Sequence, residues 1–354
     1  MEPETPPVGP LNVFDYERLA RERLPAGAWA YYADGAGDRV TLRENRAAFE
    51  RIQIVPRMLR GVKTADTRTT VLGTAVGMPL LVAPMAAQGL ACAEGEVATA
   101  RAAGATGTLM IAATEANRPL AEIAAAATGP LWYQLYVYQG RRAMAERHVR
   151  AAEAAGCRAL VVTVDAPRWG RKETSERDEF VLPAGMGWGN FERDADDISL
   201  EPAALAWDDV DWLRSLTTLP LVLKGLLAPE DAREAVARGV DGIVVSNHGG
   251  RQLDGVPASI TALPAIVAAM DGRCEIYLDS GIRRGTDALK ALALGARAVL
   301  VGRPVLWGLA ADGADGARRV LGLLRDELEL AMALAGVGSV AEVATLGAGL
   351  LRMG

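Results

Sequence analysis

From about residue 78 onward, short hydrophobic segments alternate with runs in which apolar residues have helical spacing. Segments that are apolar throughout are typical of strands buried on both faces of a parallel sheet. Seven of the eight gaps, counting the one after the last segment, hold a helix of 10 or more residues. The eight predicted strands are 80–84, 107–111, 132–136, 159–165, 221–225, 242–246, 275–279 and 298–302.

Eight β-α units in about 230 residues predict an α/β fold of the TIM (β/α)8 barrel type. An open doubly wound sheet is the alternative, but eight strands favour closure. Residues 84–90 after the first strand read PMAAQGL, so the glycine fingerprint of a dinucleotide-binding fold is missing there. We expect a single domain over 1–354, with the barrel at about 78–315.

The segments before, after and within the predicted barrel are predicted separately. Residues 11–24 predict an N-terminal helix capped by Asn12 or Asp15, and 315–354 predict two closing helices. The acidic, proline-rich residues 1–10 predict disorder and do not resemble a signal peptide. The connection after the fourth strand is about 55 residues long, and its irregular, acidic part predicts a lid at about 170–206.

Composition, net charge and cysteine spacing argue against several classes of protein and of site. The 354 residues are 50% hydrophobic, which excludes a disordered chain, and the net charge of -6 argues against nucleic acid or an anionic membrane as the main partner. No apolar run reaches about 18 residues, so no transmembrane helix is expected. Cys92, Cys157 and Cys274 are widely spaced, which predicts neither disulfides nor a metal site and fits a reducing cytoplasm. Of the two histidines, His148 lies among arginines and predicts a surface residue.

Polar residues collect at the ends of six consecutive predicted strands, where barrels place their chemistry. Arg283 and Arg303 stand beside glycines after the seventh and eighth strands, where barrels bind phosphate. Lys224 would face another part of the same ligand, and an ammonium group suits the negative charge of a reduced flavin. The pattern predicts bound FMN, with Gln134, Thr163 and Ser246 hydrogen-bonding along the polar edge of its ring.

Several motifs make the chain resemble a known family, the FMN-dependent α-hydroxy acid oxidases and dehydrogenases, which include glycolate oxidase, lactate oxidase and mandelate-type enzymes. The resemblance spans about residues 12 to 345, and SNHGGRQLD is its most specific motif. The motifs are YYADGA at 31–36, PMAAQ at 84–88, QLY at 134–136, TVDAP at 163–167, LKG at 223–225 and SNHGGRQLD at 246–254.

The resemblance implies a role for each site residue. His248 is the base that takes a proton during oxidation, and Asp165 holds its ring. Arg251 and Tyr31 bind the substrate carboxylate, and Tyr136 contacts the hydroxyl being oxidised. The implied FMN contacts are Lys224 at flavin N1 and O2, the backbone of Pro84, Met85 and Ala86 beside N5, and Asp279, Ser280, Gly281, Arg283, Gly302 and Arg303 on the ribityl chain and phosphate.

Two positions depart from the family pattern. Ala113 followed by Thr114 stands where a hydroxyl-bearing residue often follows the second strand, so one flavin contact is lost. Lys172 stands where the family usually has an arginine that reaches the substrate. Because lysine offers a point charge and no bidentate fork, we expect poor activity on glycolate and lactate and better activity on a bulkier acid. The alternative is that the neighbouring Arg171 does the usual work.

The function implied is FMN-dependent oxidation of an L-2-hydroxy acid, the (S) form, to the 2-oxo acid, with electrons passed to O2 to give H2O2 or to another acceptor. An enzyme acting on a larger, carrier-bound or amine-type substrate stays open. A barrel that binds FMN without turnover and a flavin isomerase are disfavoured, because neither needs the set His248, Arg251, Tyr136 and Asp165. The family resemblance also implies a homo-oligomer, a tetramer.

Overall fold

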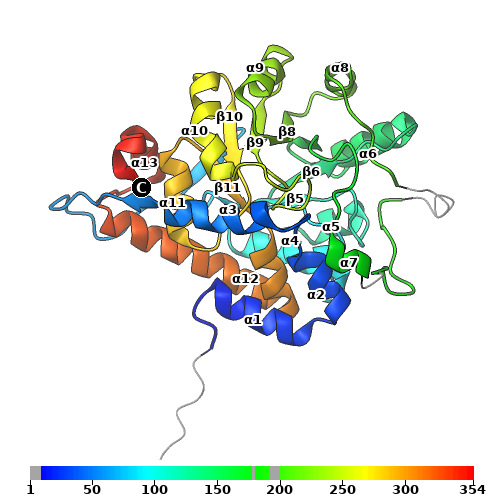
Figure 1. Cartoon of the computed structure of the whole chain (residues 1–354), viewed down its shortest axis with the longest axis horizontal. Coiled ribbons are helices and arrows are strands. Elements are labelled where there is room, and N and C mark those ends of the chain that lie inside the picture. The colour runs from blue at the N-terminus through cyan, green and yellow to red at the C-terminus, as the bar shows by residue number, and fades with distance from the viewer. Residues whose placement is uncertain (1–8, 178–179, 192–199) are drawn as a thin grey trace, which may run out of the picture.

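The computed structural model describes residues 9–177, 180–191 and 200–354. Its centre is a closed barrel in which eight parallel strands pair in chain order, and the last strand returns to pair with the first (Figure 1). All eight predicted strands are confirmed, and so is the closed barrel. The strands are β4 (Leu80–Val82), β5 (Met110–Ala112), β6 (Leu131–Leu135), β7 (Leu160–Thr163), β8 (Leu221–Leu226), β9 (Gly242–Val245), β10 (Glu275–Leu278) and β11 (Ala298–Val301).

Helices follow the strands and cover the outside of the barrel (Figure 1). Alternate strand residues point outward against these helices, as Leu80 and Val82 do, while Leu81 between them points into the barrel. The covering helices are α4 (Glu96–Ala105), α5 (Leu120–Ala126), α6 (Arg142–Ala154), α8 (Trp207–Leu216), α9 (Pro229–Ala237), α10 (Ser259–Met270), α11 (Gly285–Ala293) and α12 (Arg303–Leu334).

The amino-terminal end of the barrel is filled by apolar side chains. Trp132 and Tyr277 meet edge to face across the interior, with ring centroids 5.5 Å apart. A hairpin that the sequence analysis did not predict, β2 (Thr69–Val71) and β3 (Thr74–Val76), contributes Val71 and Val76 to the same buried cluster. This packing fills the barrel interior at its amino-terminal end, and the cavity described below lies toward the carboxyl ends of the strands.

The N-terminal extension packs against the barrel through three helices, α1 (Val13–Arg23), α2 (Ala26–Ala33) and α3 (Val40–Glu50). Of the two predicted caps of α1, Asn12 is the one that the structure shows. Its Oδ1 accepts hydrogen bonds from the N–H groups of Phe14 and Asp15. The helix α1 then lies along α12, at the bottom of Figure 1.

The C-terminal part contains the two predicted helices and one strand that was not predicted. The chain bends at Asp312 and Gly313 within α12, and α13 (Val340–Leu346) follows. The last strand, β12 (Leu351–Met353), pairs antiparallel with β1 (Ile52–Ile54), so the end of the chain closes on its N-terminal region.

The predicted lid at about 170–206 is partly described. It contains α7 (Glu173–Arg177), which packs against α2 at the lower right of Figure 1. Residues 178–179 and 192–199 of this segment lie outside the described part of the chain, as do residues 1–8, where most of the predicted N-terminal disorder falls.

The prediction that His148 is a surface residue is wrong. Its side chain is buried, and its Nδ1 lies 2.9 Å from the Tyr133 hydroxyl. Burial lowers the pKa of His148 to about 4, so the ring is neutral at pH 7. The arginines around it in the sequence belong to the outer face of α6, and the helical period turns His148 to the inner face.

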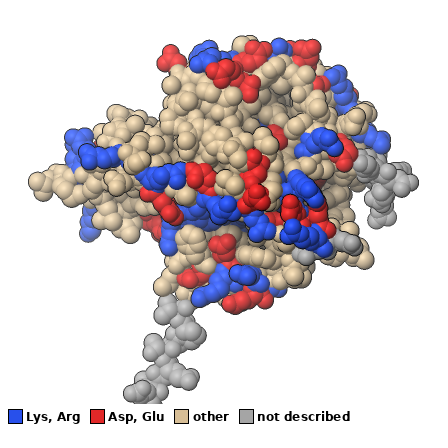
Figure 2. Space-filling model, viewed as in Figure 1, with Lys and Arg blue, Asp and Glu red and all other residues tan. Residues whose placement is uncertain are grey.

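Basic and acidic side chains lie interspersed on the face shown in Figure 2, and neither sign forms a continuous field there. Among the described helices, none is both long enough and apolar enough to cross a membrane.

Candidate active site

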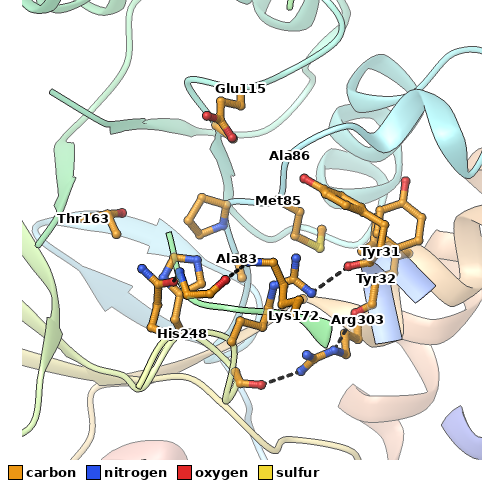
Figure 3. Close-up of a pocket in the computed structure, with 18 of the residues that line it drawn as sticks. Tyr31, Tyr32, Ala83, Met85, Ala86, Glu115, Thr163, Lys172, His248 and Arg303 are labelled. Carbon is orange, nitrogen blue, oxygen red and sulfur yellow. Dashed lines mark hydrogen bonds between the residues drawn. The ribbon is translucent and has the colours of Figure 1, made fainter. Parts of the chain in front are cut away.

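A cavity of about 860 Å³ lies at the carboxyl end of the barrel (Figure 3). It is lined by strand ends, by α2 and by described residues of the long connection after β7, from 169–176, 180–188 and 200–201. All of the predicted site residues line it except Asp165 and Ser246, which lie directly behind His248 and Lys224. The fold therefore brings residues from seven separate strand ends to one place.

His248 and Asp165 form a hydrogen-bonded pair. His248 Nδ1 lies 2.8 Å from Asp165 Oδ1, and the backbone N–H of His248 donates to Ser246 Oγ over 3.0 Å. Burial alone would raise the pKa of Asp165, but the charges of His248 and Lys224 outweigh it and hold that pKa below its usual value. An ionised Asp165 keeps the proton on Nδ1, so the free lone pair is on Nε2, which faces the cavity.

Tyr136 stands next to this nitrogen. Its hydroxyl lies 3.4 Å from His248 Nε2. Burial raises the pKa of Tyr136 well above its usual value, and the nearby carboxylates of Glu115 and Asp165 raise it further. The phenol is therefore protonated and can donate a hydrogen bond to a ligand.

The loop after β9 carries His248 and also packs closely against neighbouring parts of the chain. Gly250 has a φ of +73°, and a Cβ there would lie 2.7 Å from the backbone nitrogen of Leu42, so only glycine fits. Gln252 joins this loop to the loop after β7, since it accepts from the N–H of Gly170 and donates to the carbonyl of Asp165. The loops that carry His248 and Asp165 are thus held together by side chains of one motif.

Arg251 presents a positive charge to the cavity. Its Nη1 donates to the carbonyl of Tyr31 over 2.7 Å, and its guanidinium lies over the Tyr31 ring. It forms no ion pair with any carboxylate of the described residues. Burial raises the pKa of Tyr31 to about 12, so this hydroxyl also remains a donor. An arginine beside a neutral phenol suits a ligand carboxylate.

Two further arginines, Arg283 and Arg303, line the same cavity, and Arg303 lies near Arg251, since both donate to the carbonyl of Asp34. Arg283 is 9% exposed and stacks on Trp307, and Arg303 donates to the carbonyls of Tyr32, Asp34 and Gly249. Neither forms an ion pair with a residue that the structure describes. Burial lowers the pKa of Arg283 to about 10, and burial together with Arg251 and Arg283 lowers that of Arg303. Cations held this way need an anion, and a phosphate group would satisfy both.

Lys224 supplies a third fixed charge. Its Nζ donates to Ser246 Oγ over 3.0 Å and lies 3.2 Å from Asp279 Oδ2. Burial would lower its pKa, but Asp279 and Asp165 raise it more, so the ammonium stays charged. Gln134 and Thr163, joined by a 3.1 Å hydrogen bond, lie on the same cavity wall as polar groups. This arrangement of cations and polar groups fits FMN, which is anionic at its phosphate and becomes anionic at its reduced ring.

The family profile described as FMN-dependent dehydrogenase matches residues 20–347. The chain belongs to the FMN-dependent dehydrogenase family. It is 49% identical to the L-lactate oxidase of Nostoc sp., covering 95% of this chain and 97% of that one, and 47% identical to the glycolate oxidase of Spinacia oleracea, covering 94% of each. A crystal structure of mandelate oxidase superposes with a TM-score of 0.91 at 46% identity over 97% of this chain and 98% of that one. FMN is the cofactor of this family.

The two departures noted in the sequence have clear positions in this member of the FMN-dependent dehydrogenases. Thr114 is fully buried, and its hydroxyl donates to the carbonyl of Gln134, so it does not reach the cavity. Ala113 does line the cavity and offers only a methyl group.

Lys172 lines the cavity, and Arg171 does not. The Lys172 Nζ donates to the carbonyl of Gly170 over 2.8 Å, and burial lowers its pKa to about 8. The Arg171 side chain is 74% exposed and pairs with Glu176. The structure therefore gives no support to the alternative that Arg171 replaces the usual substrate arginine.

Sequence analysis missed several residues of the substrate side. Glu115 is the third residue after β5 and projects into the cavity, a position at which an acidic residue at a strand end could have been noticed. Phe180 stacks on Tyr31 with ring centroids 5.1 Å apart. It comes from the long connection after β7, whose irregular sequence gives no periodic signal. Trp169 in the same connection was not missed, since an aromatic beside the lid could wall a pocket or pack within the lid. It lines the cavity and meets Tyr136 edge to face at 5.4 Å.

Proposed function

We propose that this protein oxidises an (S)-2-hydroxy acid to the 2-oxo acid and passes the electrons to O2, which forms H2O2. The observation that carries the proposal is the Asp165-backed His248, whose Nε2 opens into the same cavity as Arg251. Relatives that act on lactate, glycolate and mandelate, three 2-hydroxy acids, are consistent with it.

Each residue has a defined task in this proposal. Arg251 and Tyr31 bind the substrate carboxylate, and Tyr136 donates a hydrogen bond to the substrate hydroxyl. His248 Nε2 accepts a proton from the substrate, and Asp165 stabilises the imidazolium that results. Oxidation removes two electrons and two protons from the substrate, and bound FMN supplies the two-electron acceptor that O2 reoxidises.

We assign the cofactor contacts to the cavity residues around Lys224, Arg283 and Arg303. Arg283 and Arg303 would bind the FMN phosphate, and Lys224 would stabilise negative charge on the reduced ring. The other proposed contacts are Pro84, Met85, Ala86, Gln134, Thr163, Ser246, Asp279, Ser280, Gly281 and Gly302. Ala86 is a small residue on the cavity wall, which is compatible with access for O2.

Substrate size, compartment and oligomeric state are further parts of the proposal. Lys172 in the cavity favours a 2-hydroxy acid bulkier than lactate, because its single charge can meet a second group on the ligand. A reducing cytoplasm suits the unpaired cysteines Cys92, Cys157 and Cys274. A homo-oligomer stays a prediction from the family resemblance, as does the single domain.

The test is anaerobic reduction of the purified yellow protein by a panel of (S)-2-hydroxy acids, followed by absorbance. The proposal expects bleaching of the flavin, recovery of colour in air and one H2O2 per 2-oxo acid formed. Bleaching that persists in air until a quinone or cytochrome is added would show a dehydrogenase. No bleaching by any acid of the panel would overturn the proposed function.

A further inference from the structure

Glu115 is a carboxyl group in the active-site cavity that the proposed reaction does not use. It follows β5, and its backbone carbonyl is fixed by the N–H of Ala87. Its Oε1 accepts a 2.9 Å hydrogen bond from the Tyr138 hydroxyl. The other carboxyl oxygen makes no hydrogen bond to a residue that the structure describes. Because Glu115 lines the cavity, a donor on a ligand can reach this oxygen.

Two neighbours of this carboxyl favour its ionised form, which only accepts hydrogen bonds. Burial raises the pKa of Glu115 to about 7, while the Tyr138 hydrogen bond and the positive charge of Lys172 lower it. Tyr138 is itself a poor acid, because burial and Glu115 raise its pKa well above the usual value. The Tyr138 proton therefore stays on the phenol, and the carboxyl keeps a free oxygen for another donor.

The position of Glu115 relates it to the substrate. In Figure 3 it enters the cavity on the side opposite His248 and Arg303. The Tyr138 ring that holds it lies beside Tyr136, with ring centroids 6.3 Å apart. Since Tyr136 is the residue assigned to the substrate hydroxyl and Arg251 is assigned to its carboxylate, the remaining substituent of the α-carbon is the part free to extend toward Glu115.

We propose that Glu115 is a specificity-determining residue that accepts a hydrogen bond from the substrate side chain. The substrate class that fits is a 2-hydroxy acid whose side chain ends in a hydroxyl or ammonium group. This inference rests on the proposed oxidation of 2-hydroxy acids and specifies which of them the site takes. A site built to hydrogen-bond a donor rejects an analogue without it, because the buried acceptor is then left unpaired.

The first experiment compares matched substrates on the FMN-loaded enzyme. Each (S)-2-hydroxy acid with an unbranched side chain of two to five carbons is supplied in three forms, ending in methyl, hydroxyl or ammonium. For the chain length that reaches Glu115, the inference expects kcat/KM at least about 10-fold higher for a donor-ended form than for the methyl-ended form. Equal or better turnover of the methyl-ended form at every length would overturn it.

Variants at Glu115 test whether this carboxyl causes the preference for donor-ended substrates, and whether the preferred donor is a hydroxyl or an ammonium group. Glu115→Leu removes both acceptor oxygens and should abolish the preference for donor-ended substrates. Glu115→Gln keeps one acceptor oxygen but no charge, so preference for a hydroxyl should persist while preference for an ammonium should be lost. The matched control is Glu201→Gln, another acidic residue that lines the cavity, which should leave the preference unchanged. A preference that survives Glu115→Leu would overturn the inference.

A binding measurement separates this inference from the proposed reaction. The corresponding 2-oxo acids are titrated into the FMN-loaded protein, and binding is followed by fluorescence of the tryptophans, of which Trp169 and Trp188 line the cavity. The donor-ended oxo acid should bind at least about 10-fold tighter to wild type than to Glu115→Leu. Glu115-dependent binding of the 2-oxo acids, together with no flavin bleaching by the corresponding 2-hydroxy acids, would overturn the proposed function and leave the role of Glu115 intact. Bleaching by the 2-hydroxy acids with no Glu115 dependence of binding would overturn the role of Glu115 and leave the proposed function intact.

Discussion

The two ends of the active-site cavity draw on sets of segments that only partly overlap. The cofactor end consists of residues at the ends of barrel strands, such as Lys224, Arg283 and Arg303. The substrate end also uses residues that follow strands, Tyr136 and Arg251. It adds Lys172 and Phe180 from the long connection after β7 and Glu115 from the shorter one after β5. Strand ends are positioned by the whole barrel, whereas a long connection is positioned by its own contacts.

The residues of the two ends also differ in how they are held. At the cofactor end Arg303 makes three hydrogen bonds to backbone carbonyls, and Lys224 is held by Ser246 and Asp279. At the substrate end Lys172 and Glu115 each make one side-chain hydrogen bond to a described residue. Such a division lets one barrel keep its cofactor chemistry while side chains at the other end set the substrate.

The strongest test of this division is His248→Gln, at the boundary between the two ends. Flavin should stay bound, because its proposed contacts come from other residues, while kcat should fall by a factor on the order of 10²–10⁴, the usual contribution of a positioned general base. Steady-state H2O2 production and the flavin spectrum measure both effects. Turnover at the wild-type rate would exclude His248 as the base.

Arg283→Ala should weaken the cofactor end. Loss of a charge-assisted contact to the phosphate should reduce FMN affinity by about 10- to 100-fold, measured by flavin fluorescence on titration of the apoprotein. The neighbouring Arg284 pairs with Glu327 and does not line the cavity, so Arg284→Ala is the matched control and should keep wild-type affinity. Equal FMN affinity in both variants would place the phosphate elsewhere.

Lys172→Ala should affect the substrate end alone. We expect kcat/KM for a bulky 2-hydroxy acid whose side chain carries a second polar group to fall by about 10-fold with FMN affinity unchanged, because one charge–ligand contact is lost. Arg171→Ala should change little, since Arg171 is exposed and pairs with Glu176. A large loss for Arg171→Ala with none for Lys172→Ala would assign the contact to Arg171. Efficient turnover of glycolate by wild type would contradict the expected preference for a larger acid.

The smallest effect is a pH dependence. Burial lowers the pKa of Lys172 to about 8, so its charge is present below that pH and is lost above it. The ratio of kcat/KM in wild type to that in Lys172→Arg should therefore fall a few-fold between pH 7 and pH 9, because arginine stays charged. A constant ratio over that range would show that the charge of Lys172 does not contribute to substrate binding.

Much of the cofactor end could be predicted from the sequence, and less of the substrate end. Glycine-flanked Arg283 and Arg303 follow buried strands, and barrel geometry brings all strand ends to one face. His248 and Asp165 were predictable as a pair only through the family resemblance, since 83 residues separate them. The hairpin β2–β3 and strand β12 were missed because their segments mix polar and apolar residues and give no continuous apolar run like those of the barrel strands.

The sequence by itself determined the barrel, its strand ends and the cofactor, because these depend on local periodicity and on residue types next to strands. Only the tertiary structure decided which of two adjacent residues, Arg171 or Lys172, enters the cavity, and that His148 is buried beside Tyr133. It also placed the Glu115 carboxyl beside the Tyr138 hydroxyl. The physical reason is that side-chain direction in a connection, and burial on a helix, depend on contacts with distant parts of the chain that no local pattern encodes.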